Sequence, residues 1–436
     1  MRCFSIAATA ALIAVFAVAC GGSSSEDDFP ELTPFPASMA ERLHEIRDKV
    51  ADIRGLPINE EAEEGLVTTE ALQEYGRGQY AALEEEDEAD VEAGEATLEL
   101  LGLVPPGFSF EEDYSDQSTE LIAGLYYFEE DRLVLVGEAT DDLTVSEELT
   151  LAHEYTHSLQ DAHYDLEEYF TMWTESQLEE DGYSSYSETL SCLIEGDAEL
   201  TQRLYAEEEI GEDWREQAAA DYADDPPSFD LPDFLLRATY FNYTDCVAFV
   251  EQLYEDGGWD AVNAAYDDPP ATTEQVLHPE KYHSGELART PKPESLAQDV
   301  DGWTELSGGQ FGEYDVYNYV LTLSDDIFAA LTGAEGWGAG WVSVYRDEDD
   351  PSRVAVHISL DWDTPEDYGE FLLAFGGVLE SYGVAPENVA VADVLRWTAE
   401  ADFDQFGAAL LNEDLLRVEM IFSGDEDGRE TFVAEL

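Results

Sequence analysis

The spacing of apolar side chains predicts that the N-terminal part of the chain is helical. From Ala37 to about Leu103, apolar residues recur every three or four positions, which places them on one face of an α-helix. The Pro-Pro-Gly sequence at 105–107 ends this unit, because proline and glycine interrupt helices. The most regular run is Met39, Leu43, Ile46, Val50 and Ile53.

A β-hairpin and a capped helix are expected next. The apolar segments 125–128 and 133–136 flank three acidic residues, which is a strand, turn, strand pattern. Thr144 is in the N-cap position of the following helix, and Glu147 three residues later completes a capping box. This helix should continue to about Ala162.

In the rest of the chain, the predicted secondary structure changes from helical to a mixture of helices and strands. Another helix is expected from about 187 to 204, and residues 213–266 are mostly helical in pattern. From about Gly302 strands and helices alternate. Segments 341–345 and 354–362 form a second strand, turn, strand pattern, and we expect one face of the latter to be core. Thr364 and Pro365 then begin a helix that Gly383 ends.

The first twenty residues have the layout of a signal peptide. Arg2 precedes an apolar run from Phe4 to Val18, and small residues lead to Cys20. The run is shorter than the roughly 20 residues that span a bilayer. It resembles a bacterial-type lipobox, which implies lipidation of Cys20 and a protein of the cell envelope, anchored in the membrane and facing outside the cytoplasm.

These patterns predict an α+β protein with four parts. Residues 1–20 are the signal peptide, and residues 21–36 form a flexible tether rich in Gly, Ser, acidic residues and Pro. A mainly helical domain with a small β-hairpin follows at 37–300, and a mixed α/β domain at 301–436.

The charge of the chain limits its partners. There are 102 acidic and 18 basic residues, a formal net charge of −84. Self-repulsion on this scale is relieved when salt screens it, so we expect a saline habitat. Nucleic acid is excluded as a partner, because binding phosphate needs clustered Lys and Arg.

Two cysteines remain if Cys3 leaves with the signal peptide and Cys20 carries lipid. Outside the cytoplasm, Cys192 and Cys246 can pair in a disulfide. Two buried free thiols are an equal alternative.

The segment His153-Glu154-Tyr155-Thr156-His157 fits the H-E-x-x-H motif. Because it lies on a predicted helix, four residues turn the chain by about 400°, so His153 and His157 project from one face, one turn apart. Both nitrogens can then bind one Zn²⁺. Glu154 points beside that face, where it can act as general base on a zinc-bound water. The alternative is a solvated helix with incidental histidines.

Two residues compete as third zinc ligand. His163 has the spacing of the metzincin pattern, but that pattern needs a glycine where this chain has Gln160. In a continuous helix, His163 would lie about 9 Å along the axis from His157, too far for one ion. Glu195 is on the next predicted helix, within a Glu-Gly-x-Ala sequence.

These motifs resemble the gluzincins, a branch of the zincin metallopeptidases. The resemblance implies that Glu195 is the third zinc ligand and that Gly196 permits close packing against the helix of the motif. Residues 153–166, 195–198 and 257–282 also resemble a poorly characterised family of secreted and lipoprotein metallopeptidases of halophiles and other bacteria. That similarity extends over most of residues 40–380 and implies a zincin-like catalytic domain.

Three further residues are candidates for supporting roles. Zinc peptidases place a donor opposite the base to stabilise the oxyanion, and we nominate Tyr282, with His278 second. The alternative for both is a structural loop. Glu199, one turn after Glu195, can orient a ligand histidine, or it is simply a solvated acid.

The expected function is that of an exported, membrane-anchored zinc metallohydrolase, a peptidase acting on a peptide or protein outside the cytoplasm. The alternative is a surface binding or assembly lipoprotein that keeps the metal fold without turnover. Hydrolysis of a non-peptide envelope amide or ester is a third reading.

Overall fold

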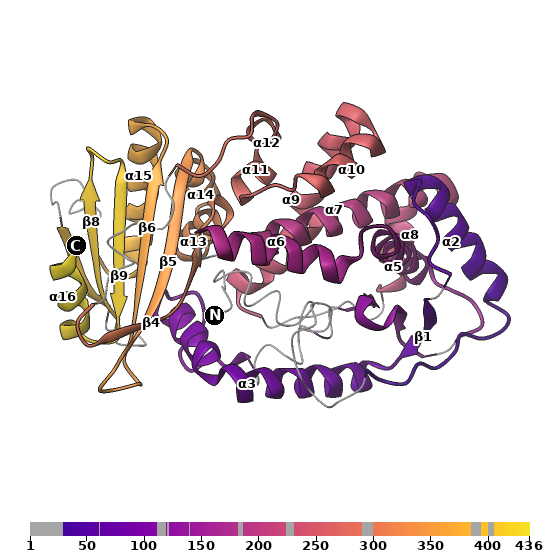
Figure 1. The fold of residues 1–436 in the computed structure, drawn as a ribbon, viewed down its shortest axis with the longest axis horizontal. Helices are drawn as coiled ribbons and strands as arrows, with labels where there is room; N and C mark the ends of the chain where they lie inside the picture. Colours follow the sequence, from indigo (N-terminus) through magenta and orange to yellow (C-terminus); the bar gives the residue numbers. More distant parts are fainter. Residues whose placement is uncertain are drawn as a thin grey trace.

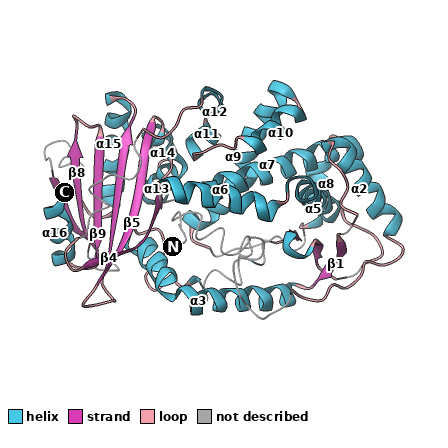
Figure 2. Ribbon diagram, in the orientation of Figure 1, coloured by secondary structure: helices cyan, strands magenta, loops and turns pink. Residues whose placement is uncertain are grey.

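Two β-sheets organise the computed structural model, which confirms the α+β class (Figures 1 and 2). One sheet has three strands and lies among the N-terminal helices, and the other has six and forms most of the C-terminal part. The structure describes residues 29–60, 62–110, 119, 122–138, 140–181, 186–223, 231–289, 300–384, 394–399 and 405–436.

The three-stranded sheet consists of β1 (Glu63–Val67), β3 (Arg132–Val136) and β2 (Gly124–Tyr127), in that order. β2 and β3 form the predicted antiparallel hairpin around a short 3₁₀ helix, Phe128–Glu130, and β1 pairs with β3 in parallel. The sequence prediction of a continuous helical unit over 37–103 was wrong at β1. That strand begins with two glutamates and has only a short buried end, so its apolar pattern is too brief to indicate a strand.

Helices surround this sheet. The bounds of α5 and α7 match the predicted helices, whereas α6 lies in a segment that the sequence prediction treated as an acidic connection. α5 begins at the capping box of Thr144 and Glu147, as expected: Glu147 N–H donates to Thr144 Oγ1, and Thr144 N–H donates to the Glu147 carboxylate. α7 packs against both α5 and α9 in the core of this part. The elements of this part are α2 (Ala40–Arg54), α3 (Thr69–Leu100), α5 (Val145–Tyr164), α6 (Leu166–Asp181), α7 (Tyr186–Tyr205), the π-helix η3 (Ala206–Ile210), α8 (Trp214–Asp221), α9 (Asp233–Gly257), α10 (Trp259–Asp267), α11 (Thr273–Leu277) and α12 (Pro279–Ser284).

The six-stranded sheet is antiparallel throughout, in the order β4-β5-β6-β9-β8-β7. The C-terminal half of α3 and the helices α13, α14 and α15 share a core with one face of it, and α16 covers part of the other. Its elements are β4 (Trp303–Gln310), α13 (Glu313–Ser324), α14 (Ile327–Ala334), β5 (Trp337–Asp347), β6 (Val354–Trp362), α15 (Pro365–Ser381), β7 (Val394–Ala399), β8 (Gln405–Asn412), β9 (Arg417–Ser423) and α16 (Glu426–Glu435).

Strand β6 is buried on both faces, although its alternating sequence predicted a single core face. The second face is buried because its polar side chains are paired within the sheet. His357 Nε2 lies 2.6 Å from Glu419 Oε2, and Arg417 binds both carboxylate oxygens of Asp361. Burial of charged groups is tolerated when they are paired in this way.

Helix α3 connects the two parts of the molecule. It has 32 residues, which corresponds to a length of about 48 Å, and Figure 1 shows it running from the small sheet to the large one. Its C-terminal half belongs to the same core as the large sheet, and Tyr382 donates a hydrogen bond of 2.7 Å to Leu101 O. The sequence prediction placed a domain boundary at residue 300 and did not foresee that α3 packs with the C-terminal domain.

The start of the described chain differs from the expected tether. Phe29 is buried and stacks on Tyr127, and Thr33 pairs with Leu66 of β1. The apolar ring of Phe29 anchors residues 29–36 to the folded domain. The sequence prediction missed this contact because the segment is otherwise polar. The signal peptide, Cys20 and the remainder of the tether lie outside the described residues. Within the part of the chain that is described, no helix has the length and apolar character needed to span a membrane.

Candidate metal centre

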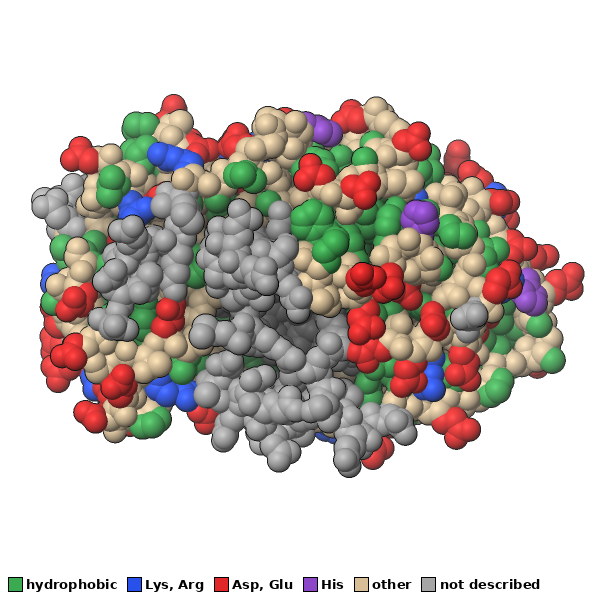
Figure 3. Space-filling model, in the orientation of Figure 1, with side chains coloured by type: hydrophobic (Ala, Val, Ile, Leu, Met, Phe, Trp, Pro, Cys, Tyr) green, Lys and Arg blue, Asp and Glu red, His purple; other side chains and the backbone are tan. Residues whose placement is uncertain are grey.

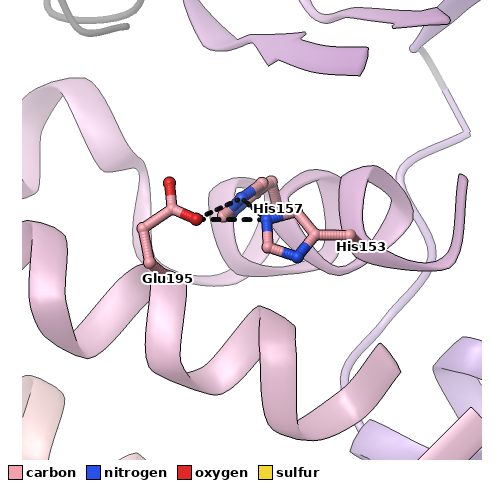
Figure 4. Close-up of side chains that lie close together, drawn as sticks. All are labelled: His153, His157 and Glu195. Carbon is pink, nitrogen blue, oxygen red and sulfur yellow. Dashed lines mark hydrogen bonds and ion pairs between the residues drawn. The ribbon is translucent and has the colours of Figure 1, made fainter. Parts of the chain in front are cut away.

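Helices α5 and α7 carry the three predicted ligands. His153 and His157 project from one face of α5, one turn apart, and Glu195 reaches them from the facing side of α7 (Figure 4). All three residues are less than 10% exposed. The sequence motif and the downstream glutamate therefore meet at one buried point.

The distances among these side chains fit a tetrahedral ion. His153 Nε2 lies 2.9 Å from His157 Nε2 and 3.1 Å from Glu195 Oε2, and His157 Nε2 lies 3.6 Å from the same oxygen. Ligand bonds of 2.0–2.1 Å at tetrahedral angles place neighbouring ligand atoms about 3.3 Å apart. The three contacts bracket that value, so these side chains are spaced as the ligands of one metal ion would be.

Gln160 determines which ring nitrogen of His157 carries the proton and which one has a free lone pair. Its amide nitrogen donates to Ile194 O at 3.0 Å, so its oxygen is the end that faces His157. His157 Nδ1 lies 2.8 Å from that oxygen and must donate to it, because an amide oxygen only accepts. In the neutral ring Nε2 is then unprotonated and directed at the site. The sequence prediction had treated Gln160 only as the residue that breaks the metzincin pattern.

Glu199 lies behind the other histidine. Its Oε1 is 3.4 Å from His153 Nδ1, an ion-pair distance without the geometry of a hydrogen bond. A carboxylate only accepts, so this contact favours a proton on Nδ1 and a free lone pair on Nε2. Two imidazole lone pairs and a carboxylate oxygen therefore face a common point. These are groups that bind a metal cation.

Burial and the neighbouring charges alter the acidity of the cluster. Burial raises the pKa of Glu154 above its ordinary value, against the effect of the two histidines and of a hydrogen bond from the backbone of Tyr126. Burial alone would lower the pKa of His153, but Glu195 and Glu199 raise it well above the usual range. The pKa of Glu195 is depressed in spite of burial, because both histidines stabilise its anion. In the metal-free chain the cluster thus retains protons that a divalent ion would displace.

A small cavity, with a volume of about 70 Å³, opens onto the ligands. Its wall is largely apolar. Strand β2 forms one side, and Gly124 allows it to approach α5 closely: a Cβ at this position would lie 2.5 Å from Thr150 Cγ2 and 3.2 Å from Glu154 Cγ. The described lining residues are Gly124, Leu125, Tyr126, Phe128, His153, Glu154, His157, Leu166, Phe170, Ile194, Glu195 and Tyr243.

Tyr243 is a site residue that sequence reasoning missed. It lies on α9, its ring centroid is 6.1 Å from that of His153, and it lines the cavity. Burial raises the pKa of its phenol well above the usual range, and the carboxylates of Glu195 and Glu154 raise it further. The hydroxyl therefore stays protonated and is placed to donate a hydrogen bond to the Glu195 carboxylate beside the cavity. Sequence alone offered no signal, because α9 carries several tyrosines in an ordinary amphipathic pattern.

The structure does not bring Tyr282 or His278 to the site. Tyr282 donates to Asp268 O at 2.8 Å, and His278 Nε2 lies 2.9 Å from Glu313 Oε1. Neither residue lines the cavity. The structural-loop alternative fits both, and the nomination of either as oxyanion donor has no geometric support. His163 is exposed at the end of α5 and takes no part in the site, as expected.

The other acidic cluster among the described residues is paired with a lysine, Lys281. Glu274, Glu286 and Asp363 could together hold a metal ion. The ammonium of Lys281 lies between them, at 2.5, 2.9 and 3.1 Å respectively. Because Lys281 already neutralises these acids, its ion pairs link α11 and α12 to Asp363 at the end of β6.

Gly196 packs differently from the expectation that the gluzincin resemblance implied. A Cβ there would lie 2.5 Å from Cys246 O and 2.8 Å from Val250 Cγ2, so the closest neighbours of the glycine belong to α9 and not to the helix of the motif.

Cys192 and Cys246 form a disulfide between α7 and α9, which decides between the two alternatives left open by the sequence.

Comparison with known proteins identifies no relative of this chain. No protein-family model, no curated protein and no solved structure matches it. The resemblance to gluzincins and to lipoprotein metallopeptidases stays a prediction, and the function has to be inferred from the site itself.

Proposed function

We propose that this protein is a zinc-dependent hydrolase of the zincin type that cleaves peptide bonds outside the cytoplasm. One observation carries the proposal: two imidazole nitrogens with free lone pairs and one carboxylate oxygen converge at tetrahedral spacing beside a buried glutamate. The two-nitrogen, one-oxygen donor set favours zinc, and three protein ligands leave a fourth position open.

Glu154 is the proposed general base. When bound, zinc supplies Lewis-acid polarisation and lowers the pKa of water toward neutrality. Glu154 lies next to His153 on α5 and lines the same cavity without belonging to the ligand set. Burial raises the pKa of its carboxyl, which brings it closer to the working range of a group that takes a proton and later returns it.

Tyr243 takes the role that was assigned to Tyr282. Its phenol remains protonated, and it lines the cavity from α9. A donor in this position can stabilise the oxyanion that develops when a carbonyl is attacked. The proposed machinery therefore comes from three helices: α5 supplies the base and two ligands, α7 the third ligand, and α9 the hydrogen-bond donor.

The edge of β2 favours a peptide as substrate. Val136 N–H donates to Ala123 O, and hydrogen-bonded pairs alternate along an antiparallel ladder. The main-chain groups of Gly124 and Tyr126 are thus directed away from β3, toward the edge of the described sheet that lines the cavity. The Tyr126 N–H donates to Glu154, which leaves the Gly124 groups and the Tyr126 carbonyl for a peptide. An extended peptide can pair with such an edge and place apolar side chains along the aliphatic and aromatic wall. A small non-peptide amide would not use this edge.

The buried disulfide supports export, because disulfides persist in oxidising compartments. Acidic side chains are spread over the described parts of the face in Figure 3, with few basic ones, which agrees with the expected saline habitat and with the exclusion of nucleic acid.

A mixed peptide library tests the proposal. The zinc-loaded wild type should cleave it, and Glu154→Gln should keep its zinc and lose about 10²–10⁴-fold in rate. If both proteins hold one zinc ion and neither cleaves any peptide, the peptidase proposal is wrong, and a binding or assembly protein that keeps the metal fold is the better account.

A further inference from the structure

We propose that the Cys192–Cys246 disulfide positions the metal centre by fixing the helix of Glu195 against the helix of Tyr243, so that the site binds metal tightly only in the oxidised chain. This rests on the proposed zinc site. The two cysteines would then be positioning residues, acting through Glu195 and Tyr243 and touching neither metal nor substrate.

The disulfide lies close to both residues along the chain. Cys192 is three residues before Glu195 on α7, and Cys246 is three residues after Tyr243 on α9. Three residues correspond to about 4.5 Å along a helix axis and to nearly one full turn. The bond therefore joins the helices within one turn of each functional side chain. Both cysteines are fully buried.

The seam between α7 and α9 has little freedom at this level. The cysteine Cα atoms are 5.0 Å apart. One turn further along α7, Gly196 lies so close to α9 that an added Cβ would be 2.5 Å from Cys246 O and 2.8 Å from Val250 Cγ2. Backbone thus packs on backbone beside the bond, and any separation of the helices would displace Glu195 from the histidines of α5.

The net charge of the chain shows why a covalent tie between the two helices is useful. The chain has a formal net charge of −84, and the resulting self-repulsion opposes close packing of α7 on α9. The disulfide holds the ligand geometry in place before metal arrives, which reduces the reorganisation that binding would otherwise require.

Zinc affinity is the decisive readout, measured by competition with a chromophoric chelator in the full chain. Cys192→Ala/Cys246→Ala should bind zinc at least about tenfold more weakly than the wild type, similar to the loss caused by removing outer-shell support. Wild type refolded with reductant should show the same weakening, whereas reductant should leave the affinity of the double variant unchanged.

Two single variants separate positioning from general loss of stability. Val250→Ala removes both γ-methyl groups, of which Cγ2 packs at Gly196, and should weaken zinc binding by a smaller factor with the disulfide intact. Leu235→Ala is the control, since this buried residue lies on α9 but belongs to the core of the C-terminal part. It should lower the melting temperature and leave zinc affinity unchanged. If the double variant does not fold, the comparison of Val250→Ala with Leu235→Ala decides.

The outcomes are distinct. If the folded double variant binds zinc as tightly as the wild type, or if Val250→Ala and Leu235→Ala behave alike, the disulfide is only a stabilising crosslink and the inference is overturned. If the oxidised wild type itself binds no zinc, the proposed function fails.

Discussion

His157 Nδ1 lies 2.8 Å from Gln160 Oε1, and this hydrogen bond leaves Nε2 of His157 free to bind a cation. The same Gln160 side chain donates to the backbone of Ile194, the residue before Glu195. One buried amide therefore sets the tautomer of one ligand and ties its helix to the helix of another.

Gln160→Leu should weaken zinc binding by about 10–100-fold, the usual effect of removing an outer-shell partner of a ligand histidine. The histidine loses its fixed tautomer and orientation, while both ligands remain. Chelator competition measures the change. Gln217→Leu, which removes a partly exposed amide on α8, is the matched control and should have no effect on affinity.

Tyr243→Phe should reduce kcat by about 10²–10³-fold with little change in KM and full zinc content, because an oxyanion donor acts mainly in the transition state. Steady-state kinetics on a cleaved peptide, with metal analysis of the same sample, checks this. Tyr282→Phe removes a hydroxyl of the same kind whose hydrogen bond goes to Asp268 O, so its kcat should remain that of the wild type. Equal losses in the two variants would exclude the assigned role.

Asp315→Asn should stabilise the protein at alkaline pH. Asp315 is buried at the start of α13, burial raises its pKa to about 7, and after burial its charge is what raises the pKa of Glu188. A carboxyl with a raised folded-state pKa contributes stability below its unfolded pKa and loses it as pH rises through the folded value. The wild type therefore loses stability between about pH 4 and 7, and the uncharged asparagine does not.

Urea unfolding at several pH values measures this difference. The variant should match the wild type near pH 4 and exceed it by about 1–3 kcal/mol near pH 8, less than the full shift implies because buried charges relax. Asn can still accept the hydrogen bond from Gly312 N–H. The exposed Asp301→Asn is the control, and its difference from wild type should not depend on pH in this range.

Arg54→Leu should lower the free energy of unfolding by about 3–5 kcal/mol, because it leaves the buried Asp197 without its cation. Arg54 binds both carboxylate oxygens of Asp197, at 2.6 and 2.9 Å, with neither side chain exposed. Arg396→Leu, which breaks an exposed pair with Glu430, should change stability by less than about 1 kcal/mol. Similar losses in the two variants would contradict this reading of the buried pair.

Local sequence patterns predicted the elements that carry the ligands. The capping box of Thr144 and Glu147 fixes the start of α5, and from there the four-residue spacing alone places His153 and His157 on one face. Glu195 came from the gluzincin resemblance, and the structure brings it within 3.1 Å of His153. These inferences succeed because helix geometry depends on near neighbours in the chain.

The features that sequence reasoning missed depend on distant contacts. Tyr243 is a site residue only because α9 packs on α7, and no spacing along the chain encodes that contact. Strand β1 has too short an apolar pattern to stand out, and it is fixed by pairing with β3. The second buried face of β6 likewise depends on His357 meeting Glu419, 62 residues away.

The most direct test of the metal centre is the zinc content of purified, folded protein after loading and dialysis. The wild type should retain one zinc ion per chain, and His153→Ala and Glu195→Gln should retain almost none while their circular dichroism spectra match that of the wild type. A wild type that retains no zinc, or a His153→Ala variant that retains as much as the wild type, would contradict the assignment of these three residues as ligands of a common ion.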